Sequence, residues 1–380
     1  MRGVVTNDKE SFLIPNTTAA ESSGASWFID FIDITSTGFK IKSNYGIVNG
    51  DGGNYSFTAL RRPDGYVGKP PSLGTDVFAM DTGAGSSTIP NFDSGFPVDF
   101  VLGRTPASSA DWNAGARLIQ TRFLDTNDAG GEHSGAAMVY DSNVGWNNLS
   151  GWDSGAQSWM WKRHAGFDVV TYKADSTSKH SIPHQMGQTP EFMWVKNRDN
   201  NNRNWAIYHK GLNGGTNPEQ YYLEFDTGAE ASSSTHWSDT APTAFDFTIG
   251  NSLYTNEGPQ QYIAILFASA NDINGNPISK VGYYTGNGTS GSSTQTITTG
   301  FQPRFVIIKR VDTSNSYTGW IVFDTTRGWG SGDDEGIFLN SSGAQSAYQY
   351  GTPTSTGFTL VEDYTATNSN NGKYIYYAHA

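Results

Sequence analysis

Five aromatic side chains stand in loop-like stretches where a flat ring could stack on the face of a sugar. Each lies among Gly, Ser or Asn residues, and none recurs at a fixed position along the chain. An aromatic ring offers an apolar face, and Tyr and Trp add a polar edge, which suits a ligand of mixed polarity. Partial burial or a subunit contact is the alternative interpretation. The five candidates are Trp152, Trp237, Trp329, Tyr348 and Tyr350.

Other sequence motifs that could bind a cofactor or a metal lack the neighbouring secondary structure that they need. Residues 286–291 satisfy GxGxxG, but a strand-like run follows them instead of the helix whose amino terminus would hold a pyrophosphate. His180 and His184 are four residues apart, but Pro183 and a turn-like context remove the helical geometry of a zinc pair. We found no P-loop, no GxSxG elbow and no HExxH motif in the sequence.

Acidic and amide residues gather in two short loops, 271–276 and 332–335, which are rich enough in oxygen to suggest calcium. Neither carries the full calcium loop with its distal Glu, so turns between modules explain them more simply. Glycoside hydrolysis would need two carboxylates facing each other, and Asp226 lies in a turn-like context. We therefore expect no metal, no cofactor and no enzymatic activity.

The charge and residue content of the chain argue against several classes of binding partner. The 24 basic and 36 acidic residues give a net charge of −12, which argues against nucleic acid and against an anionic membrane surface. There is no cysteine, so disulfides and thiolate metal sites are excluded. The longest apolar run is too short to insert into a bilayer, and no basic-then-apolar leader is visible in the first thirty residues.

The elements that would position these residues are short strands. Runs such as 305–309, 320–323, 358–361 and 374–377 are β-branched or aromatic, with Gly, Asn, Asp, Ser or Pro around each. Their spacing of roughly ten residues is typical of a sandwich or a barrel. The sequence therefore predicts an all-β protein of tandem β-sandwich modules, jelly-roll or lectin-like. A propeller is the less favoured alternative, because three copies do not close one.

The chain repeats itself, and we count about three and a half copies of one module. Pro190-Glu191-Phe192 matches Pro303-Arg304-Phe305, and Lys210-Gly211 matches Arg327-Gly328. A fixed period of this size indicates an array of similar units. The predicted divisions are an orphan second half of a module at 1–60, a diverged module A at 76–165, module B at 168–269 and module C at 280–380.

Some aromatics recur at one place in each copy. A position that is filled alike in every module is best explained by packing in the sandwich interior. We therefore expect these recurring aromatics to be core residues and not ligand contacts. They are Trp112, Trp205 and Trp320, and Tyr55, Tyr262 and Tyr374.

The repeated elements resemble modules of virion proteins from marine tailed phages. The pattern GFxPxFVxIK stands at 300–309, WxxFD at 320–324 with Arg327-Gly328, and STGFxL at 355–360, with weaker matches at 168–269 and 1–60. Module A departs from it, since neither WxxFD nor Arg-Gly survives there, and it could have a different role. The resemblance implies lectin-like β-sandwich modules in tail-fibre or structural proteins, and it supplies no catalytic residues.

The resemblance implies a virion protein, a tail fibre or another appendage, whose modules bind host glycans weakly and gain strength from multiplicity. Its expected partners are other virion proteins and copies of itself, and its expected location is the virion, assembled in the host cytoplasm. Two alternatives stay open: a capsid-surface decoration protein without receptor binding, and a bacterial carbohydrate-binding protein or glycoside-active enzyme. We expect the orphan half module to be completed by an upstream segment or by a neighbouring subunit.

Overall fold

The computed structural model forms two units, Met1–Tyr66 and Val67–Ala380. The helices among the described residues are three or four residues long and the remaining elements are strands, which confirms the all-β prediction. No helix in the described part of the chain could span a membrane. The structure describes residues 11–12, 22–23, 32–35, 38–41, 46–58, 68–83, 90–133, 138–148, 155–290 and 294–380.

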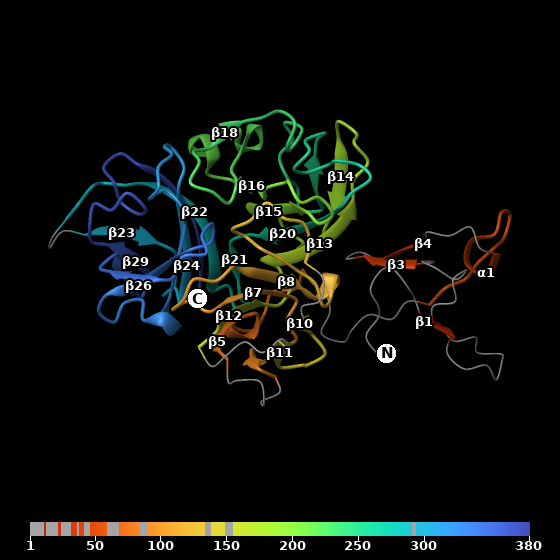
Figure 1. Cartoon of the computed structure of the whole chain (residues 1–380), viewed down its shortest axis with the longest axis horizontal. Helices are drawn as coiled ribbons and strands as arrows, with labels where there is room; N and C mark the ends of the chain where they lie inside the picture. Colours follow the sequence, from red (N-terminus) through yellow and green to blue (C-terminus); the bar gives the residue numbers. More distant parts are fainter. Residues whose placement is uncertain are drawn as a thin grey trace. The chain divides into compact units, whose positions relative to one another are not determined.

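Three main antiparallel sheets share one strand order along residues 67–380 (Figure 1). In each sheet the last long strand is central and pairs with the first strand on one side and the second on the other. Module A has the order β5 (Phe78–Thr82), β12 (Gln157–Trp161), β7 (Phe100–Arg104), β8 (Asn113–Ala116), β9 (Phe123–Leu124). Module B has β13 (Phe167–Lys173), β20 (Gln261–Phe267), β15 (Phe192–Asn197), β16 (Ala206–His209). Module C has β21 (Ala270–Asn271), β22 (Pro277–Thr285), β30 (Lys373–His379), β24 (Phe305–Arg310), β25 (Trp320–Asp324), β26 (Asp334–Phe338), β27 (Ser346–Tyr348).

A smaller sheet packs against one face of each main sheet, so each module is a two-layer sandwich with its own apolar interior. These sheets are β6 (Phe92–Asp93), β10 (Met138–Val139) and β11 (Gly145–Asn148) in A, β14 (His180–Pro183) and β19 (Asp246–Ile249) in B, and β23 (Gln295–Thr298), β28 (Gly351–Thr354) and β29 (Gly357–Leu360) in C. Other short elements are β17 (Tyr221–Tyr222), β18 (Ala231–Ser232), η1 (Gly74–Asp76), η2 (Arg117–Ile119), η3 (Leu212–Gly215), η4 (Pro218–Gln220) and η5 (Thr325–Arg327).

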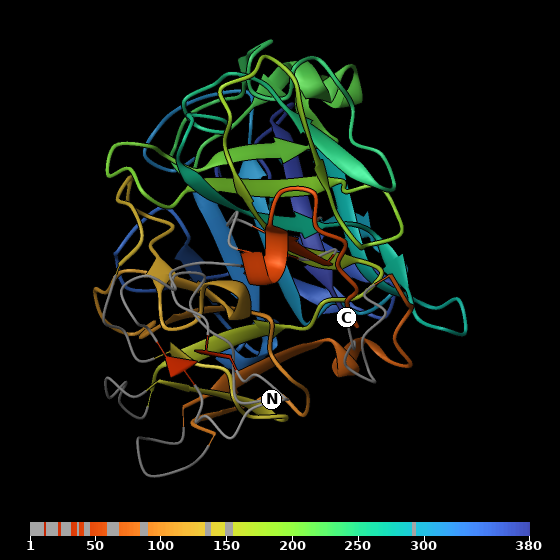
Figure 2. The same cartoon turned by 90° about the vertical axis from the view of Figure 1, so that its right-hand side faces the viewer.

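The other face of all three main sheets is buried in one shared core. Figure 2 gives a second view of how the strands of the three modules are arranged. Because side chains alternate across a strand, β24 sends Val306 and Ile308 into its own sandwich, while Phe305 and Ile307 enter the shared core. Phe100 and Phe192 occupy the same strand position in modules A and B and lie in the same core. The modules therefore close around a common interior instead of following one another in a line.

Three tryptophans join the modules into a ring. Trp205 of module B donates its indole N–H to the backbone oxygen of Asp125 in module A at 2.8 Å. Trp320 of module C donates in the same way to Glu224 of module B at 2.8 Å. Trp112 of module A closes the ring by donating to Phe338 of module C, again at 2.8 Å. All three are buried, as predicted, and each satisfies a backbone acceptor that would be costly to bury unpaired.

The predicted core position is confirmed for two of the three recurring tyrosines and is wrong for the third. Tyr262 and Tyr374 are buried as predicted. The prediction of a core position was wrong for Tyr55, which is 45% exposed. Tyr55 belongs to the first unit, which contains β1 (Ser11–Phe12), β2 (Ser22–Ser23), β3 (Ile32–Thr35), β4 (Gly38–Ile41) and α1 (Gly46–Asn49).

Candidate functional site

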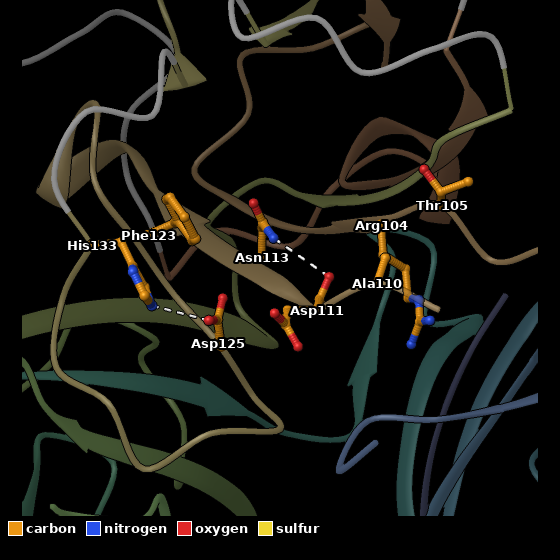
Figure 3. Close-up of a pocket in the computed structure, with 8 residues that line it drawn as sticks. All are labelled: Arg104, Thr105, Ala110, Asp111, Asn113, Phe123, Asp125 and His133. Carbon is orange, nitrogen blue, oxygen red and sulfur yellow. Dashed lines mark hydrogen bonds and ion pairs between the residues drawn. The ribbon is translucent and has the colours of Figure 1, made fainter. Parts of the chain in front are cut away.

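A polar pocket of about 310 Å³ lies in module A, at the ends of β7, β8 and β9. Figure 3 shows the paired rings of Phe123 and His133 at one end and Arg104 at the other, with acidic and amide side chains between them. Antiparallel pairing of the three strands brings these residues together from three places in the sequence. The pocket is lined by Arg104, Thr105, Ala110, Asp111, Asn113, Phe123, Asp125 and His133.

Asp125 is the most unusual group in this pocket. Its side chain is 9% exposed, and Oδ2 lies 3.0 Å from Nε2 of His133. The other carboxylate oxygen, Oδ1, is buried and has no hydrogen-bond partner among the described residues. Burial raises the pKa of Asp125 to about 6, and the negative charges of Asp111 and Asp128 add to this rise, while His133 opposes it. A buried carboxylate oxygen without a partner is costly when the group is charged, which agrees with the raised pKa.

Arg104 forms the opposite wall and is almost fully buried. Its Nη1 and Nη2 donate to backbone oxygens of Ser341 and Gly343 in module C at 3.0 and 2.9 Å. The remaining donor, Nε, has no hydrogen-bond partner among the described residues. Burial lowers the pKa of Arg104 to about 10, so the side chain keeps its charge at neutral pH. The guanidinium thus holds module A against module C, a contact that we call the joint between them. It also lines the pocket.

The middle of the pocket offers side chains of mixed hydrogen-bonding character. Oδ1 of exposed Asp111 accepts a hydrogen bond from the amide of Asn127 at 2.8 Å. Asn113 is half-buried, and its amide can both donate and accept. The rings of Phe123 and His133 are stacked with centroids 4.8 Å apart. Carboxylates, an amide, a guanidinium and aromatic rings together match a neutral ligand that carries hydroxyl groups and an apolar face.

Modules B and C do not keep this constellation. Lys196 and Lys309 stand at the strand position of Arg104, four residues after Phe192 and Phe305. Like Arg104 they are buried and donate to backbone oxygens of the neighbouring module, Lys196 to Asp128 at 3.4 Å and Lys309 to Gly228 at 2.7 Å. Burial lowers the pKa of both lysines to about 8. The joint is therefore a feature of all three modules, while the pocket is a feature of the diverged module A.

The pocket residues were missed at the level of sequence, although one signal was available. Asn113 directly follows the recurring Trp112, where modules B and C place Ala206 and Ile321. A polar residue that replaces an apolar one at a fixed strand position marks a local change of environment. No comparable signal marks Asp125, because its burial depends on contacts from distant parts of the chain.

The structure corrects three of the five predicted sugar-stacking aromatics. Trp237 is completely buried in the interior of module B, where its indole N–H donates to the backbone oxygen of Tyr221 at 2.9 Å. Trp329 and Tyr350 are buried in module C, both against Phe323. Small and polar neighbours in the sequence thus do not keep these rings at the surface, and none of the three presents a face to a ligand.

The outcome is different for the two remaining candidates, Tyr348 and Trp152. Tyr348 is 50% exposed at the edge strand β27, with its ring 5.9 Å from Tyr350 and 6.0 Å from Tyr364. It stays a candidate for ring stacking, separate from the pocket of module A. Trp152 lies outside the described residues.

The other sequence motifs have structural explanations. The GxGxxG stretch lies between strands β22 and β23, as expected from its context. Asp272 accepts hydrogen bonds from the backbone N–H groups of Asn274 and Asn276, which closes a turn. Asp334 accepts from the backbone of Tyr350 and Gly351. Among the described residues, no group of three or more His, Asp or Glu side chains could hold a metal ion.

A second cavity, of about 330 Å³, lies where modules A, B and C meet. Asn127 and Asn340 line it, but their side-chain oxygens accept from the backbone N–H groups of Trp112 and Trp320 at 2.9 and 2.8 Å. Asp226 lines it as well, and its Oδ1 accepts from Gly228 N–H at 2.7 Å. These polar groups hold the joints, so the module A pocket is the stronger candidate site.

Comparison with known proteins gives one family. A family model described as a domain of unknown function (DUF7483) matches residues 143–380, which contain modules B and C and the last strand of module A. No curated protein matches the chain.

Proposed function

The chain belongs to the DUF7483 family, and we propose that it is a virion structural protein of a tailed phage that contributes to host-surface attachment by weak glycan binding. In this proposal it serves in a tail fibre or another virion appendage. The observation that carries the proposal is the pocket in module A, where carboxylates, an amide and a guanidinium stand beside a stacked aromatic pair.

The chemistry of the pocket supports a neutral sugar as ligand. Sugar hydroxyls donate to carboxylates and accept from guanidinium N–H groups, and the apolar face of a sugar ring packs on an aromatic ring. Arg104 and His133 stand against Asp111 and Asp125, so charges of both signs line the pocket. This balance disfavours a strongly charged ligand. The cavity of about 310 Å³ is in the range of a small-molecule site.

The ring of modules supports the structural part of the proposal. Three sandwiches share one core and are joined by hydrogen bonds from buried indole N–H groups to backbone oxygens, which gives a rigid body suited to a multivalent assembly. A site with a dissociation constant in the millimolar range can still attach a particle when many copies act together. The protein's association with other virion proteins and with copies of itself is part of this proposal.

A glycan array tests the proposal, with the wild-type chain, Asp111→Ala and Tyr348→Ala on the same array. Both side chains are exposed, and Asn127 keeps its bond to the Trp112 N–H when Asp111 is replaced, so we expect both variants to fold. We expect glycan signals that Asp111→Ala lowers by about tenfold or more and that Tyr348→Ala leaves within about twofold. Loss of signal in Tyr348→Ala alone would transfer the site to module C.

Two further results would replace the proposal with one of its alternatives. A chain that binds no glycan but assembles onto phage particles would be a capsid-surface decoration protein. Release of shortened saccharides from array glycans that carry a reporter would indicate a glycoside-active enzyme.

A further inference from the structure

Two described features of the first unit match the second half of a sandwich module: a hairpin and a hydrogen-bonded tyrosine. Its hairpin β3–β4 turns with Thr35 opposite Gly38, as β28–β29 of module C turns with Thr354 opposite Gly357. The hairpins are therefore in the same register. The segments that come after the two hairpins along the chain are also alike.

One tyrosine makes the same pair of hydrogen bonds in each copy. The hydroxyl of Tyr55 donates to the backbone oxygen of Gly46 at 2.8 Å and accepts from the N–H of Gly50 at 2.6 Å. In module C, Tyr374 donates to Thr365 at 3.0 Å and accepts from Ser369 at 2.8 Å. The offsets are nine and five residues in both cases, and Tyr262 of module B repeats them.

The segment that contains this tyrosine has different strand pairing in the first unit. In modules B and C it is the central strand, β20 or β30, and it pairs with a strand on both sides. In the first unit, residues 54–58 contain Tyr55 in the same way but pair with no strand in the part of the chain that the structure describes. Among the described residues, no strand occupies either edge of this segment, and an unpaired strand edge is a template for pairing with another strand.

Two apolar side chains of the first unit are exposed, one on β4 and one on residues 54–58. Ile41 is 37% exposed and Phe57 is 75% exposed, while the rings of Phe39 and Phe57 pack edge to face with centroids 5.0 Å apart. Every counterpart in module C is buried in the interior of the sandwich. Phe39, Ile41, Tyr55 and Phe57 correspond to Phe358, Leu360, Tyr374 and Tyr376.

The complete module shows what covers such a face. In module C, Val306 and Ile308 of β24 and Ile321 and Phe323 of β25 pack in one cluster with these four counterparts. Together β22, β24 and β25 form the first half of the module, which pairs with and covers the second half. The matching partner for the first unit is therefore a first half module with alternating Val, Ile and Phe residues.

We propose that residues 32–35, 38–41 and 46–58 form a docking surface for a first half module with alternating Val, Ile and Phe residues, other than the first halves of modules A, B and C. The incoming strands would pair along both edges of residues 54–58 and bury Ile41 and Phe57, as a strand that completes a sheet does in other assemblies. A second copy of this chain is the poorer partner. Its own first halves are already paired with β12, β20 and β30. The proposal does not depend on glycan binding.

Hydrogen exchange on the full chain tests the proposal with a stand-in partner. The probe is residues 277–327 of this chain, fused to a soluble carrier protein. We expect the probe to slow amide exchange of residues 54–58 by tenfold or more, while the free chain exchanges rapidly there. The matched control probe carries Val306→Ser and Ile308→Ser, which remove the apolar face, and it should give no protection.

Three outcomes would overturn the proposal. Equal protection by both probes would show that the apolar face is not recognised. Protection in the free chain at every concentration would show that this surface is already covered within the chain. Protection that rises with the concentration of the free chain, together with a rising mass by light scattering, would make the occupant a second copy.

Discussion

At the scale of residues, a few buried polar atoms separate module A from its neighbours. Asp125 and Arg104 each keep one buried atom without a partner among the described residues, and both line the same pocket. Sequence comparison of the modules could have singled out Asn113. It could not have found Asp125, since a carboxylate in a short acidic loop resembles any turn residue until its burial is known.

Asp125 should make stability depend on pH in an identifiable way. Its pKa rises from 3.8 to about 6 on folding, so the folded protein retains a proton that the unfolded chain has lost between these values. The free energy of unfolding should therefore fall by up to about 3 kcal/mol from this group as pH rises from about 4 to above 6. Asp125→Asn should remove that component. Urea unfolding of both proteins from pH 4 to 7.5 measures it, and a pH-independent difference would contradict the prediction.

His379 should have the opposite effect at low pH. Burial lowers its pKa from 6.5 to about 3, so only the unfolded chain takes up this proton as pH falls below 6.5. Its contribution is complete above pH 6.5 and is lost at about 1.4 kcal/mol per pH unit towards pH 3. Trp161 and Phe267 hold the same strand position in modules A and B, so Phe is accommodated there.

The test variant for this residue is His379→Phe. It should unfold at a lower pH than the wild type in an acid titration followed by fluorescence. An unchanged or higher midpoint would show that another group controls acid unfolding.

At the scale of elements, the strands follow from the sequence, but the joints between modules do not. Alternating β-branched and aromatic residues with turn signals predicted strands such as 305–309 and 320–323, which the structure contains as β24 and β25. The same pattern cannot show that the edge of a recurring tryptophan reaches the next module. It also failed for Trp237, because a Gly- and Ser-rich neighbourhood was taken to indicate exposure when the ring in fact lies in the interior of module B.

Trp205 should stabilise the joint between modules A and B through one buried hydrogen bond. Trp205→Phe leaves the backbone oxygen of Asp125 without this donor and should cost about 1–3 kcal/mol of stability. Trp237→Phe is a matched control, because it loses an indole bond to Tyr221 within module B. Faster amide exchange at residues 125–129 should appear in the first variant and not in the second. Equal exchange in both would mean that the indole bond does not hold the joint.

At the scale of the whole molecule, sandwich modules were predicted but their closure was not. Each module contributes to its own interior and also to a core that all three share. The ring closes because Phe100, Phe192 and Phe305 sit on the second face of their sheets, where an ordinary sandwich would meet solvent. A strand pattern that is apolar on both faces indicates that both faces of the sheet are covered. It does not identify what lies against the second face.

The shared core makes residues 67–380 one cooperative unit. Differential scanning calorimetry of the full chain should show a single main transition for the three modules, because the unfolding of one module exposes the core of the others. Trp112→Ala, Trp205→Ala and Trp320→Ala should each lower the whole transition and not split it. Three separable transitions, each moved by one substitution, would contradict this view.

The most direct test of glycan binding in module A is a titration of the strongest glycan from the array into the full chain by calorimetry. Asp125→Asn removes the carboxylate charge of the pocket and one of its two acceptor oxygens, while Glu224→Gln changes the residue that holds the same joint position in module B. We predict that Asp125→Asn raises the dissociation constant about tenfold or more, equivalent to about 1.4 kcal/mol, and that Glu224→Gln leaves it unchanged. Equal affinities for all three proteins would contradict a glycan site in module A.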